Sequence, residues 1–331
     1  MQQNIIKWGI IGCGDVAEVK SGPAFQNTSQ SELVAVMRRN GDKARDFASR
    51  HGVKYWYDDA DELIQNPEVN AVYIATPPSS HFTYAMRCLE AGKDIYLEKP
   101  LGLSSQEGLR MADALKHSTS KLTVAHYRRK MDAFLKVKQM IDAHEIGDIR
   151  LVDIRILQPA QTDMIAETEE NWRLIPEVSG GGYFRDLAPH QIDLMLSWFG
   201  KPVKVYGMGV NQQKRYDVND VVQGIMEFPD QIQFRGVWAF NIAPSDQLDQ
   251  CSIYGSEGSI TFSFFGDEVE LRHPHSTERF QFPALPHVQQ PMISDTVQYF
   301  LGNGANPCAI EEAVLGMEIM EKLAGRNVPS G

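Results

Sequence analysis

The stretch Gly9-Ile-Ile-Gly12-Cys-Gly14-Asp-Val-Ala17 decides the fold, because it ends one short apolar run and leads into a helix-like segment. Gly12 permits a tight turn, Gly14 lets a pyrophosphate approach the backbone, and Ala17 lets the next helix lie close to the sheet. The unpaired N–H groups at that helix start would face the phosphates. A tight strand-to-helix turn alone would explain the glycines, but their place at the start of a β-α-β unit favours dinucleotide binding. The turn itself comprises Gly12, Cys13, Gly14, Asp15 and Val16.

Outward from this turn, residues 1–125 alternate short apolar runs with helix-like segments, which is typical of a parallel α/β sheet. We expect strands at 5–11, 32–37, 71–75, 94–97 and 122–125. Helices are expected at 43–51, 60–65, 81–91 and 105–116. The pattern predicts an α/β fold of the Rossmann type over residues 1–125.

After about residue 151 the pattern changes to longer strands in which apolar and polar residues alternate. Strands are expected at 149–157, 203–210, 221–228, 231–240, 251–254, 259–264 and 268–272, with helices at 131–143 and 189–199. Such alternation between short turns predicts an α+β domain with an open, mostly antiparallel sheet that has one covered face. A helical tail at 294–324 could pack back on the first domain. A chain of 331 residues therefore divides into two domains, 1–125 and 126–331.

The composition excludes several classes of protein. Hydrophobic residues make up 43% and charged residues 23%, which is the profile of a globular chain. The formal net charge is −11 and no tract is rich in Lys or Arg, so nucleic acid is not an expected partner. The chain start does not resemble a signal peptide, and no apolar run approaches the roughly 20 residues that span a bilayer.

The cysteines and histidines give no sign of a metal site. The four cysteines are scattered without C-x-x-C spacing, which suits free thiols in a reducing compartment, and we expect a cytoplasmic protein. His273 and His275 could share one strand face, but no third ligand lies near them in the sequence. A solvated turn is therefore expected there, and no metal.

The end of the second expected strand bears on the choice of nicotinamide. An acidic residue at this point would bind the ribose 2′-OH of NAD. Here the strand is followed by Arg38 and Arg39, whose guanidinium groups match a 2′-phosphate. A solvated surface pair is the alternative. The sequence favours NADP over NAD, which remains possible.

Two further segments end strands at the edge where open α/β sheets bind ligands. Thr76, Pro77 and Pro78 follow one strand, and His81 begins the next helix. Because proline cannot extend a strand ladder, the chain must turn out over the crevice. Glu98-Lys99-Pro100 follows the next strand, and Pro100 biases Lys99 toward an extended backbone. Lys99 could hydrogen-bond a substrate oxygen, although lysines at strand ends are common.

A second constellation begins with the three glycines 180–182 and continues to Asp186 and His190. Pro189 suits the first position of a helix, so Asp186 would precede the helix and His190 would lie in its opening turn. A helix start disfavours imidazolium, which would hold His190 neutral and ready to accept a proton. A capping aspartate and a structural histidine are the alternative.

In order and spacing these motifs resemble the glucose-fructose oxidoreductase/inositol dehydrogenase (Gfo/Idh/MocA) family of NAD(P)-dependent oxidoreductases, over nearly the whole chain. The resemblance implies a Rossmann domain followed by an open sheet that often builds homodimers or homotetramers. It implies that Lys99 polarises the reacting oxygen, that His190 exchanges its proton and that Asp186 orients substrate hydroxyls. It also implies that the cofactor is bound by the glycine turn together with Thr76, Pro77, Pro78, His81, Glu98 and Lys99. Arg38 and Arg39 join this set on the argument from the end of the second strand.

Two positions depart from the family pattern. Many members carry an acidic residue where Arg38 stands, and many carry an Asn where Tyr127 stands. Tyr127, Arg128, Trp172 and Arg173 are candidates for the wall of the substrate pocket, with Asp186. Arg and Trp suit hydroxylated or acidic sugars, through hydrogen bonds and ring stacking; packing roles are the alternative.

The sequence thus predicts an NADP-preferring enzyme that moves a hydride between nicotinamide and a sugar, polyol or related hydroxy or keto compound. Two alternatives remain open. One is a non-catalytic dinucleotide-binding sensor or regulator, which would tolerate loss of Lys99 or His190. The other is an enzyme of the same fold that keeps its cofactor and performs net non-redox glycoside chemistry.

Overall fold

The computed structural model describes residues 5–14, 17–162, 164 and 171–325. The chain forms two compact units, each built from two segments. Unit 1 comprises Met1–Tyr127 and Leu285–Val314, and unit 2 comprises Arg128–Ala284 and Leu315–Gly331. The C-terminal part of the chain is therefore divided between the two units. Leu285–Val314 belongs to unit 1 with the N-terminal segment, and Leu315–Gly331 belongs to unit 2.

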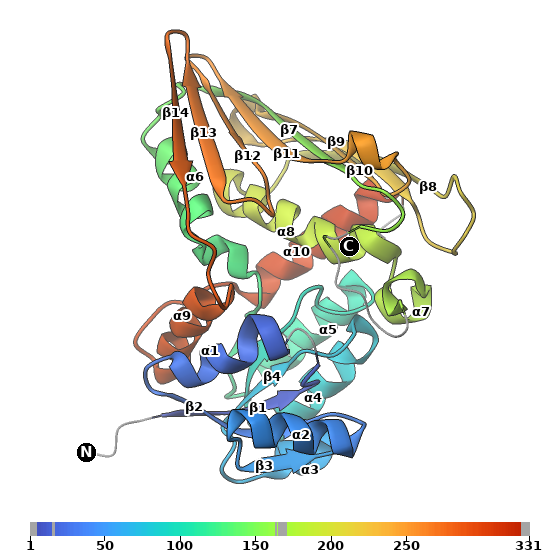
Figure 1. The fold of residues 1–331 in the computed structure, drawn as a ribbon, viewed down its shortest axis with the longest axis vertical. Coiled ribbons are helices and arrows are strands. Elements are labelled where there is room, and N and C mark those ends of the chain that lie inside the picture. Colours follow the sequence, from blue (N-terminus) through green and yellow to red (C-terminus); the bar gives the residue numbers. More distant parts are fainter. Residues whose placement is uncertain (1–4, 15–16, 163, 165–170, 326–331) are drawn as a thin grey trace. The chain divides into compact units, whose positions relative to one another are not determined.

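Unit 1 contains a six-stranded parallel sheet in the order β3-β2-β1-β4-β5-β6 (Figure 1). Its strands are β1 (Ile6–Ile11), β2 (Ser31–Met37), β3 (Tyr55–Tyr57), β4 (Ala71–Ile74), β5 (Asp94–Leu97) and β6 (Leu122–Val124). Its helices are α1 (Gly22–Asn27), α2 (Gly41–His51), α3 (Ala60–Gln65), α4 (His81–Glu90), α5 (Ser105–Lys116) and α9 (Gln290–Leu301). The strand order reverses between β1 and β4, which confirms the Rossmann topology expected from the sequence.

Helices cover both faces of this sheet, because neighbouring residues of a strand point to opposite sides. On one face the Trp8 ring lies 4.7 Å from that of Phe25 in α1 and 5.6 Å from that of Phe300 in α9. Figure 1 shows α9 beside α1. On the other face Gly9 lies against Leu63 of α3 so closely that a Cβ would come within 2.5 Å of its side chain. The returning segment 285–314 thus completes the core of unit 1.

Unit 2 contains an eight-stranded sheet in the order β14-β13-β12-β11-β7-β10-β9-β8. Its strands are β7 (Ile149–Leu157), β8 (Lys204–Val210), β9 (Val221–Glu227), β10 (Gln233–Ala239), β11 (Leu248–Gly255), β12 (Ser259–Phe262), β13 (Glu268–His273) and β14 (Ser276–Gln281). Neighbouring strands are antiparallel except β7 and β10, which pair in parallel. This confirms a mostly antiparallel sheet, and the turn expected at His273–His275 joins β13 to β14, a strand that the sequence did not predict.

One face of this sheet is covered and the other is open. The helices of unit 2 are α6 (Asp132–Asp142), α7 (Pro176–Ser179) and α8 (Gly182–Phe199), and α10 (Ile310–Leu323) continues into it from unit 1. The Phe262 ring of β12 lies 5.8 Å from the Phe134 ring of α6 and 5.8 Å from the Trp198 ring of α8. The open face exposes large apolar side chains of β8, β9 and β11, namely Tyr206, Met208, Ile225 and Tyr254.

Helix α8 begins seven residues before the start predicted at 189. Gly180 and Gly181 have φ angles of 77° and 152°, so the turn ends at Gly181 and the helix starts at Gly182. Pro189 therefore lies inside the helix, where it cannot donate to the carbonyl of the preceding turn. Most of α8 is buried, and this packing holds the helix despite the proline. The prediction that His190 lies in the opening turn is wrong, and so is the helix-terminus argument for its neutral form.

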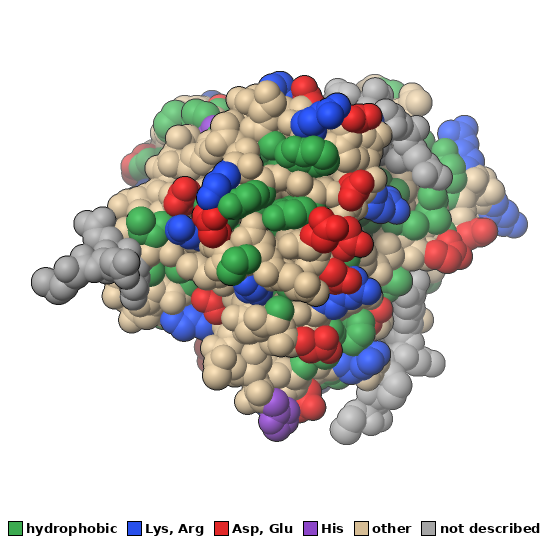
Figure 2. Space-filling view, turned by 90° about the horizontal axis from the view of Figure 1, so that it is seen from below, with side chains coloured by type: hydrophobic (Ala, Val, Ile, Leu, Met, Phe, Trp, Pro, Cys, Tyr) green, Lys and Arg blue, Asp and Glu red, His purple; other side chains and the backbone are tan. Residues whose placement is uncertain are grey.

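On the face drawn in Figure 2, acidic, basic and apolar side chains lie interspersed. The four cysteines are free, as the sequence predicted, and all four are buried. Among the described residues, each helix is too short or too polar to cross a lipid bilayer.

Candidate functional site

The glycine turn of unit 1 folds tightly against the end of β2. The backbone N–H groups of Gly12 and Cys13 both donate to the carbonyl of Met37, at 2.9 and 3.1 Å. Gly12 has a φ of +95°, and a Cβ on it would lie 2.9 Å from the carbonyl carbon of Ala75. This position therefore accepts glycine alone. Asp15 and Val16, also predicted to bind the cofactor, lie outside the described residues.

Gly14 has free space beside its Cα among the described residues, whereas Gly12 does not. A Cβ on Gly14 would meet no described atom within 4 Å. The N–H of Glu18 donates to the carbonyl of Gly14 at 2.9 Å and begins a π turn, η1 (Ala17–Ser21), before α1. The expectation that an α-helix begins directly after the turn is thus corrected. A Cβ on Gly22 would lie 2.4 Å from the carbonyl oxygen of Ala17, so this close turn needs glycine at position 22.

Arg38 and Arg39 follow β2 beside this turn. Arg38 is half-buried and its N–H donates to the carbonyl of Tyr57 at 3.2 Å, whereas Arg39 is exposed. Burial raises the pKa of the Cys13 thiol to about 11, and the nearby Arg38 charge opposes that rise. Within the described parts of the chain, neither guanidinium is paired with a carboxylate. A basic group therefore stands at the turn, where an acidic one would bind a ribose hydroxyl.

The loops after β4 and β5 are joined by His81, whose ring is 1% exposed. Its Nδ1 lies 2.8 Å from the carbonyl oxygen of Pro100, and its Nε2 lies 2.7 Å from that of Thr76. Burial lowers the pKa of His81, and the two carbonyl oxygens oppose this. Pro78 is also buried in this loop. The buried His81 ring thus links the loop after β4 to the loop after β5.

Glu98 and Lys99 stand at the carboxyl end of β5. Glu98 is 7% exposed, and its Oε2 accepts the backbone N–H of Lys99 at 3.1 Å. The Lys99 side chain is half-exposed. Because the ends of parallel strands meet at one edge of a sheet, unit 1 gathers the glycine turn, Arg38, the Thr76 loop and Lys99 along that edge.

In unit 2, Asp186 and His190 are four residues apart in α8 and so lie on one helix face. Arg173 is buried and its Nε donates to Asp186 Oδ2 at 2.7 Å. The Arg173 guanidinium also lies 4.5 Å from the ring centre of Trp172. The structure therefore brings Trp172, Arg173 and Asp186 together.

His190 and Arg128 are linked by a residue that the sequence did not indicate. The Phe265 ring lies 6.0 Å from the His190 ring, edge to face, and 4.2 Å from the Arg128 guanidinium. Arg128 also donates to the carbonyl of Phe264. Phe265 follows β12 in a loop whose composition carries no chemical signal. Tyr127, the remaining predicted wall residue, is buried at the end of the first segment of unit 1.

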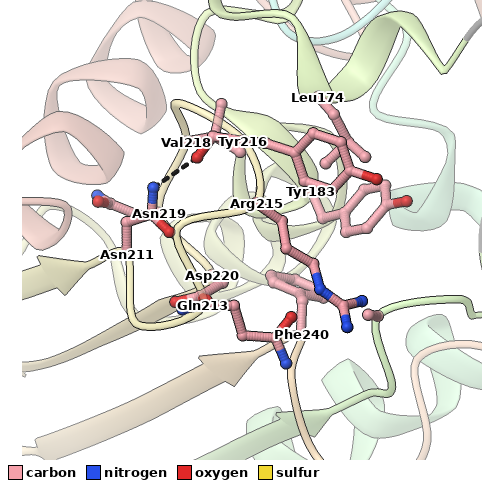
Figure 3. Close-up of a pocket in the computed structure, with 11 residues that line it drawn as sticks. Leu174, Tyr183, Asn211, Gln213, Arg215, Tyr216, Val218, Asn219, Asp220 and Phe240 are labelled. Atoms are coloured by element: carbon pink, nitrogen blue, oxygen red, sulfur yellow. Dashed lines mark hydrogen bonds between the residues drawn. The ribbon is translucent and has the colours of Figure 1, made fainter.

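A small pocket adjoins the start of α8 (Figure 3). It holds about 30 Å³ of space, and Tyr183, Tyr216 and Phe240 supply its aromatic walls. Arg215 points between these rings, while Asn211 turns back to donate to the Tyr216 carbonyl. The Tyr183 hydroxyl accepts a 2.7 Å hydrogen bond from Asn171, next to Trp172. These pocket residues were missed because the loop between β8 and β9 has no periodic pattern.

Comparison with known proteins places the chain in a family. Residues 6–126 match the model of an oxidoreductase family with an NAD-binding Rossmann fold, and residues 134–261 match the GFO/IDH/MocA C-terminal domain. The chain belongs to the GFO/IDH/MocA family. This confirms the resemblance seen in its motifs and identifies an oxidoreductase with an NAD(P)-binding Rossmann domain.

Individual proteins resemble the chain over most of its length. An oxidoreductase of Formosa agariphila is 50% identical, covering 97% of this chain and 98% of the relative. The scyllo-inositol 2-dehydrogenase (NADP(+)) of Bacillus subtilis is 27% identical over 81% of this chain and 72% of its own. A levoglucosan dehydrogenase, solved with NADH and levoglucosan, superposes with a TM-score of 0.84 at 22% identity, covering 96% of each chain.

The two glycines of the turn should respond differently to alanine. Gly12→Ala should lower the free energy of unfolding by roughly 1–3 kcal/mol, because the new methyl meets backbone at a strained φ. Gly14→Ala should leave the unliganded melting temperature unchanged, yet weaken NADPH and NADH binding on the order of tenfold, because the methyl enters the space open to the pyrophosphate. Thermal unfolding and fluorescence titration measure the two effects.

Gly304→Ala is the matched control, since its Cβ would make only an ordinary 3.6 Å contact with Gln298. It should alter neither stability nor binding. Unchanged dinucleotide affinity in Gly14→Ala would contradict the assigned position of the pyrophosphate.

Proposed function

We propose that the protein is an NADP-preferring oxidoreductase that transfers a hydride between nicotinamide and a sugar, polyol or related hydroxy or keto compound. The observation that carries the cofactor preference is the basic pair at the end of β2. Arg38 lies beside the glycine turn, at the position where an acidic residue would select NAD. Its planar guanidinium suits a 2′-phosphate, to which it can donate two parallel hydrogen bonds.

Unit 1 serves as the cofactor-binding domain in this proposal. The residues that would hold the dinucleotide are the glycine turn, Arg38 and the loops after β4 and β5. The bound cofactor supplies the hydride acceptor or donor. Thr76, Pro77 and Pro78 border the crevice, and His81 keeps their loop joined to the Glu98–Pro100 loop. Arg39, which is exposed, adds positive charge near the same phosphate.

The proton chemistry belongs to Lys99 and His190. In the oxidative direction Lys99 hydrogen-bonds the reacting hydroxyl oxygen, and His190 takes its proton as the carbon gives up the hydride. In the reductive direction the proton returns from His190 to the new hydroxyl. Proton transfer by a positioned side chain of this kind contributes about 10²–10⁴-fold to rate. Asp186, held by Arg173, orients neighbouring hydroxyl groups of the substrate.

The residues near Asp186 support a hydroxylated substrate. The Asp186 carboxylate and the Arg173 guanidinium offer several hydrogen-bonding atoms close together, and Trp172 offers an apolar ring. Such a set suits a ring with hydroxyl groups at its edge and C–H groups on its face. Family members named for scyllo-inositol and levoglucosan act on compounds of this kind, which agrees with the proposal.

Unit 2 also offers a surface for self-association, and we include a homodimer or homotetramer in the proposal. The open face of its sheet exposes Tyr206 at 63%, Met208 at 53% and Ile225 at 57%. Contiguous apolar side chains of this size on a sheet face are typical of an interface. Beside them, Arg235 and Asp153 form a bidentate pair at 2.9 Å that adds a polar element to the surface.

The cofactor preference predicts the behaviour of Arg38→Asp. The unsubstituted protein should bind NADPH more tightly than NADH, on the order of tenfold, and the substitution should narrow or reverse that preference. Fluorescence titration with both cofactors measures this. Arg45→Asp is the control, because it makes the same charge change on the exposed surface of α2. Equal affinities of the unsubstituted protein for the two cofactors would remove the NADP assignment.

The catalytic assignment predicts that Lys99→Ala and His190→Asn each lower kcat by about 10²-fold or more, with NADPH affinity retained. Turnover is measured on a panel of inositols, anhydrosugars and keto sugars. Lys116→Ala and His117→Ala, at exposed positions ending α5, should leave turnover unchanged. Near-normal turnover in a folded Lys99→Ala or His190→Asn protein would refute the roles given to them.

A further inference from the structure

A buried carboxylate stands at the end of β5 next to Lys99. Glu98 is 7% exposed, and neutral groups satisfy it. Its Oε1 accepts hydrogen bonds from the Tyr73 hydroxyl and from Gln289 Nε2, both at 2.6 Å. Its Oε2 accepts the backbone N–H of Lys99 at 3.1 Å. Neutral donors stabilise an ionised carboxylate without cancelling its charge, so its field extends into the surroundings.

Gln289 comes from the segment that returns to unit 1 and lies 191 positions from Glu98 in the sequence. It occupies the residue before α9, where a side chain would ordinarily cap the helix, yet it makes no capping hydrogen bond. Instead its amide is 1% exposed and faces Glu98. Its Oε1 accepts the Tyr96 hydroxyl at 3.1 Å. The Gln289 side chain thus hydrogen-bonds to Glu98 and Tyr96 and does not cap α9.

Two tyrosines complete the network. The rings of Tyr73 and Tyr96 stack with centres 5.2 Å apart, on the neighbouring strands β4 and β5. Burial raises the pKa of both hydroxyls well above the ordinary value, and the charge of Glu98 adds to the rise. Both tyrosines therefore remain protonated donors. This leaves Glu98 as the acceptor of the network and Gln289 as the link between Glu98 and Tyr96.

We propose that Gln289 is a positioning residue that holds the Glu98 carboxylate at the carboxyl end of β5, where its negative charge favours the oxidised, cationic nicotinamide ring over the reduced, neutral ring. The inference rests on the proposed function, since it needs the nicotinamide at this edge of the sheet. The same hydrogen bonds fix the backbone of Lys99 through Glu98 Oε2. One hydrogen-bond network would then set both the relative affinity for the oxidised and reduced cofactors and the direction of the Lys99 backbone.

The choice of glutamine follows from its two roles. An amide donates to Glu98 and accepts from Tyr96 with the same planar group. Methionine would fill the same space and lose both bonds. Glutamate would place a second carboxylate against Glu98, which like-charge repulsion disfavours. An interaction between unit charges in a partly buried site is strong enough to shift relative affinities on the order of tenfold.

The test compares the dissociation constants of oxidised and reduced cofactors. NADPH and NADH are titrated by fluorescence, and NADP⁺ and NAD⁺ by competition against them. In Glu98→Gln the ratio of the oxidised to the reduced Kd should rise on the order of tenfold, and in Gln289→Met several-fold. The change should be the same for the phosphorylated and unphosphorylated pairs, because it concerns the nicotinamide ring and not the ribose phosphate.

Asn306→Ala is the matched control. Asn306 lies on the same returning segment and donates to the carbonyl of Leu122 at 2.8 Å, without touching Glu98. It should lower the melting temperature but leave the ratio unchanged. Tyr73→Phe, which removes one donor to Glu98 and keeps the ring, should raise the ratio several-fold and supports the test if Gln289→Met does not fold.

The outcomes distinguish a failure of the proposed function from a failure of this inference alone. If the unsubstituted protein binds none of the four dinucleotides, the proposed function fails and this inference fails with it. If the cofactors bind and the ratio is unchanged in Glu98→Gln, the charge has no role and the inference alone is overturned. A ratio that changes in Glu98→Gln but not in a folded Gln289→Met protein would overturn the positioning role of Gln289.

Discussion

The close approach of Gly12 to the end of β4 is the constraint on which the site of unit 1 depends. Strands β1 and β4 run parallel and adjacent, and at their carboxyl ends the chain after β1 must turn toward β2. It does so with Gly12 and Cys13 bound to the Met37 carbonyl and with Gly12 against Ala75. No side chain fits at position 12. Two residues later, a Cβ on Gly14 would meet no described atom within 4 Å.

The same edge of the sheet carries side chains of opposite charge. Arg38 stands at the end of β2 and Glu98 lies buried at the end of β5, where Tyr73 and Gln289 satisfy it. In unit 2 a buried helix sets Asp186 and His190 one turn apart. Arg173 holds Asp186, and Phe265 lies against His190. In unit 2 the helix α8 thus carries Asp186 and His190, and residues outside it contribute the side chains around them.

The sequence predicted what local patterns determine. Alternating apolar runs located most strands of unit 1 to within a residue or two, and the glycine spacing located the turn. The strand β3 is only Tyr55–Tyr57, too short for a periodic signal, and α1 follows a π turn that its sequence does not announce. The start of α8 was misplaced because Pro189 suits a first helical position, and burial of the whole helix overrode that preference.

Contacts between distant segments could not be predicted from one sequence. Gln289 reaches Glu98 across 191 positions, and neither residue carries a pattern that pairs it with the other. Phe265 lies beside Arg128 and His190 for the same reason, through the packing of unit 2. The motifs therefore indicated candidate groups such as Glu98 and His190, while the residues that contact them became apparent only in the tertiary structure.

The most direct test of this account is a crystal structure of the protein with NADPH bound. It should show the pyrophosphate over Gly12–Gly14, the 2′-phosphate within hydrogen-bonding distance of Arg38, and the nicotinamide ring beside Lys99 at the end of β5. A dinucleotide bound away from the glycine turn, or bound there with its nicotinamide directed away from Lys99, would contradict it.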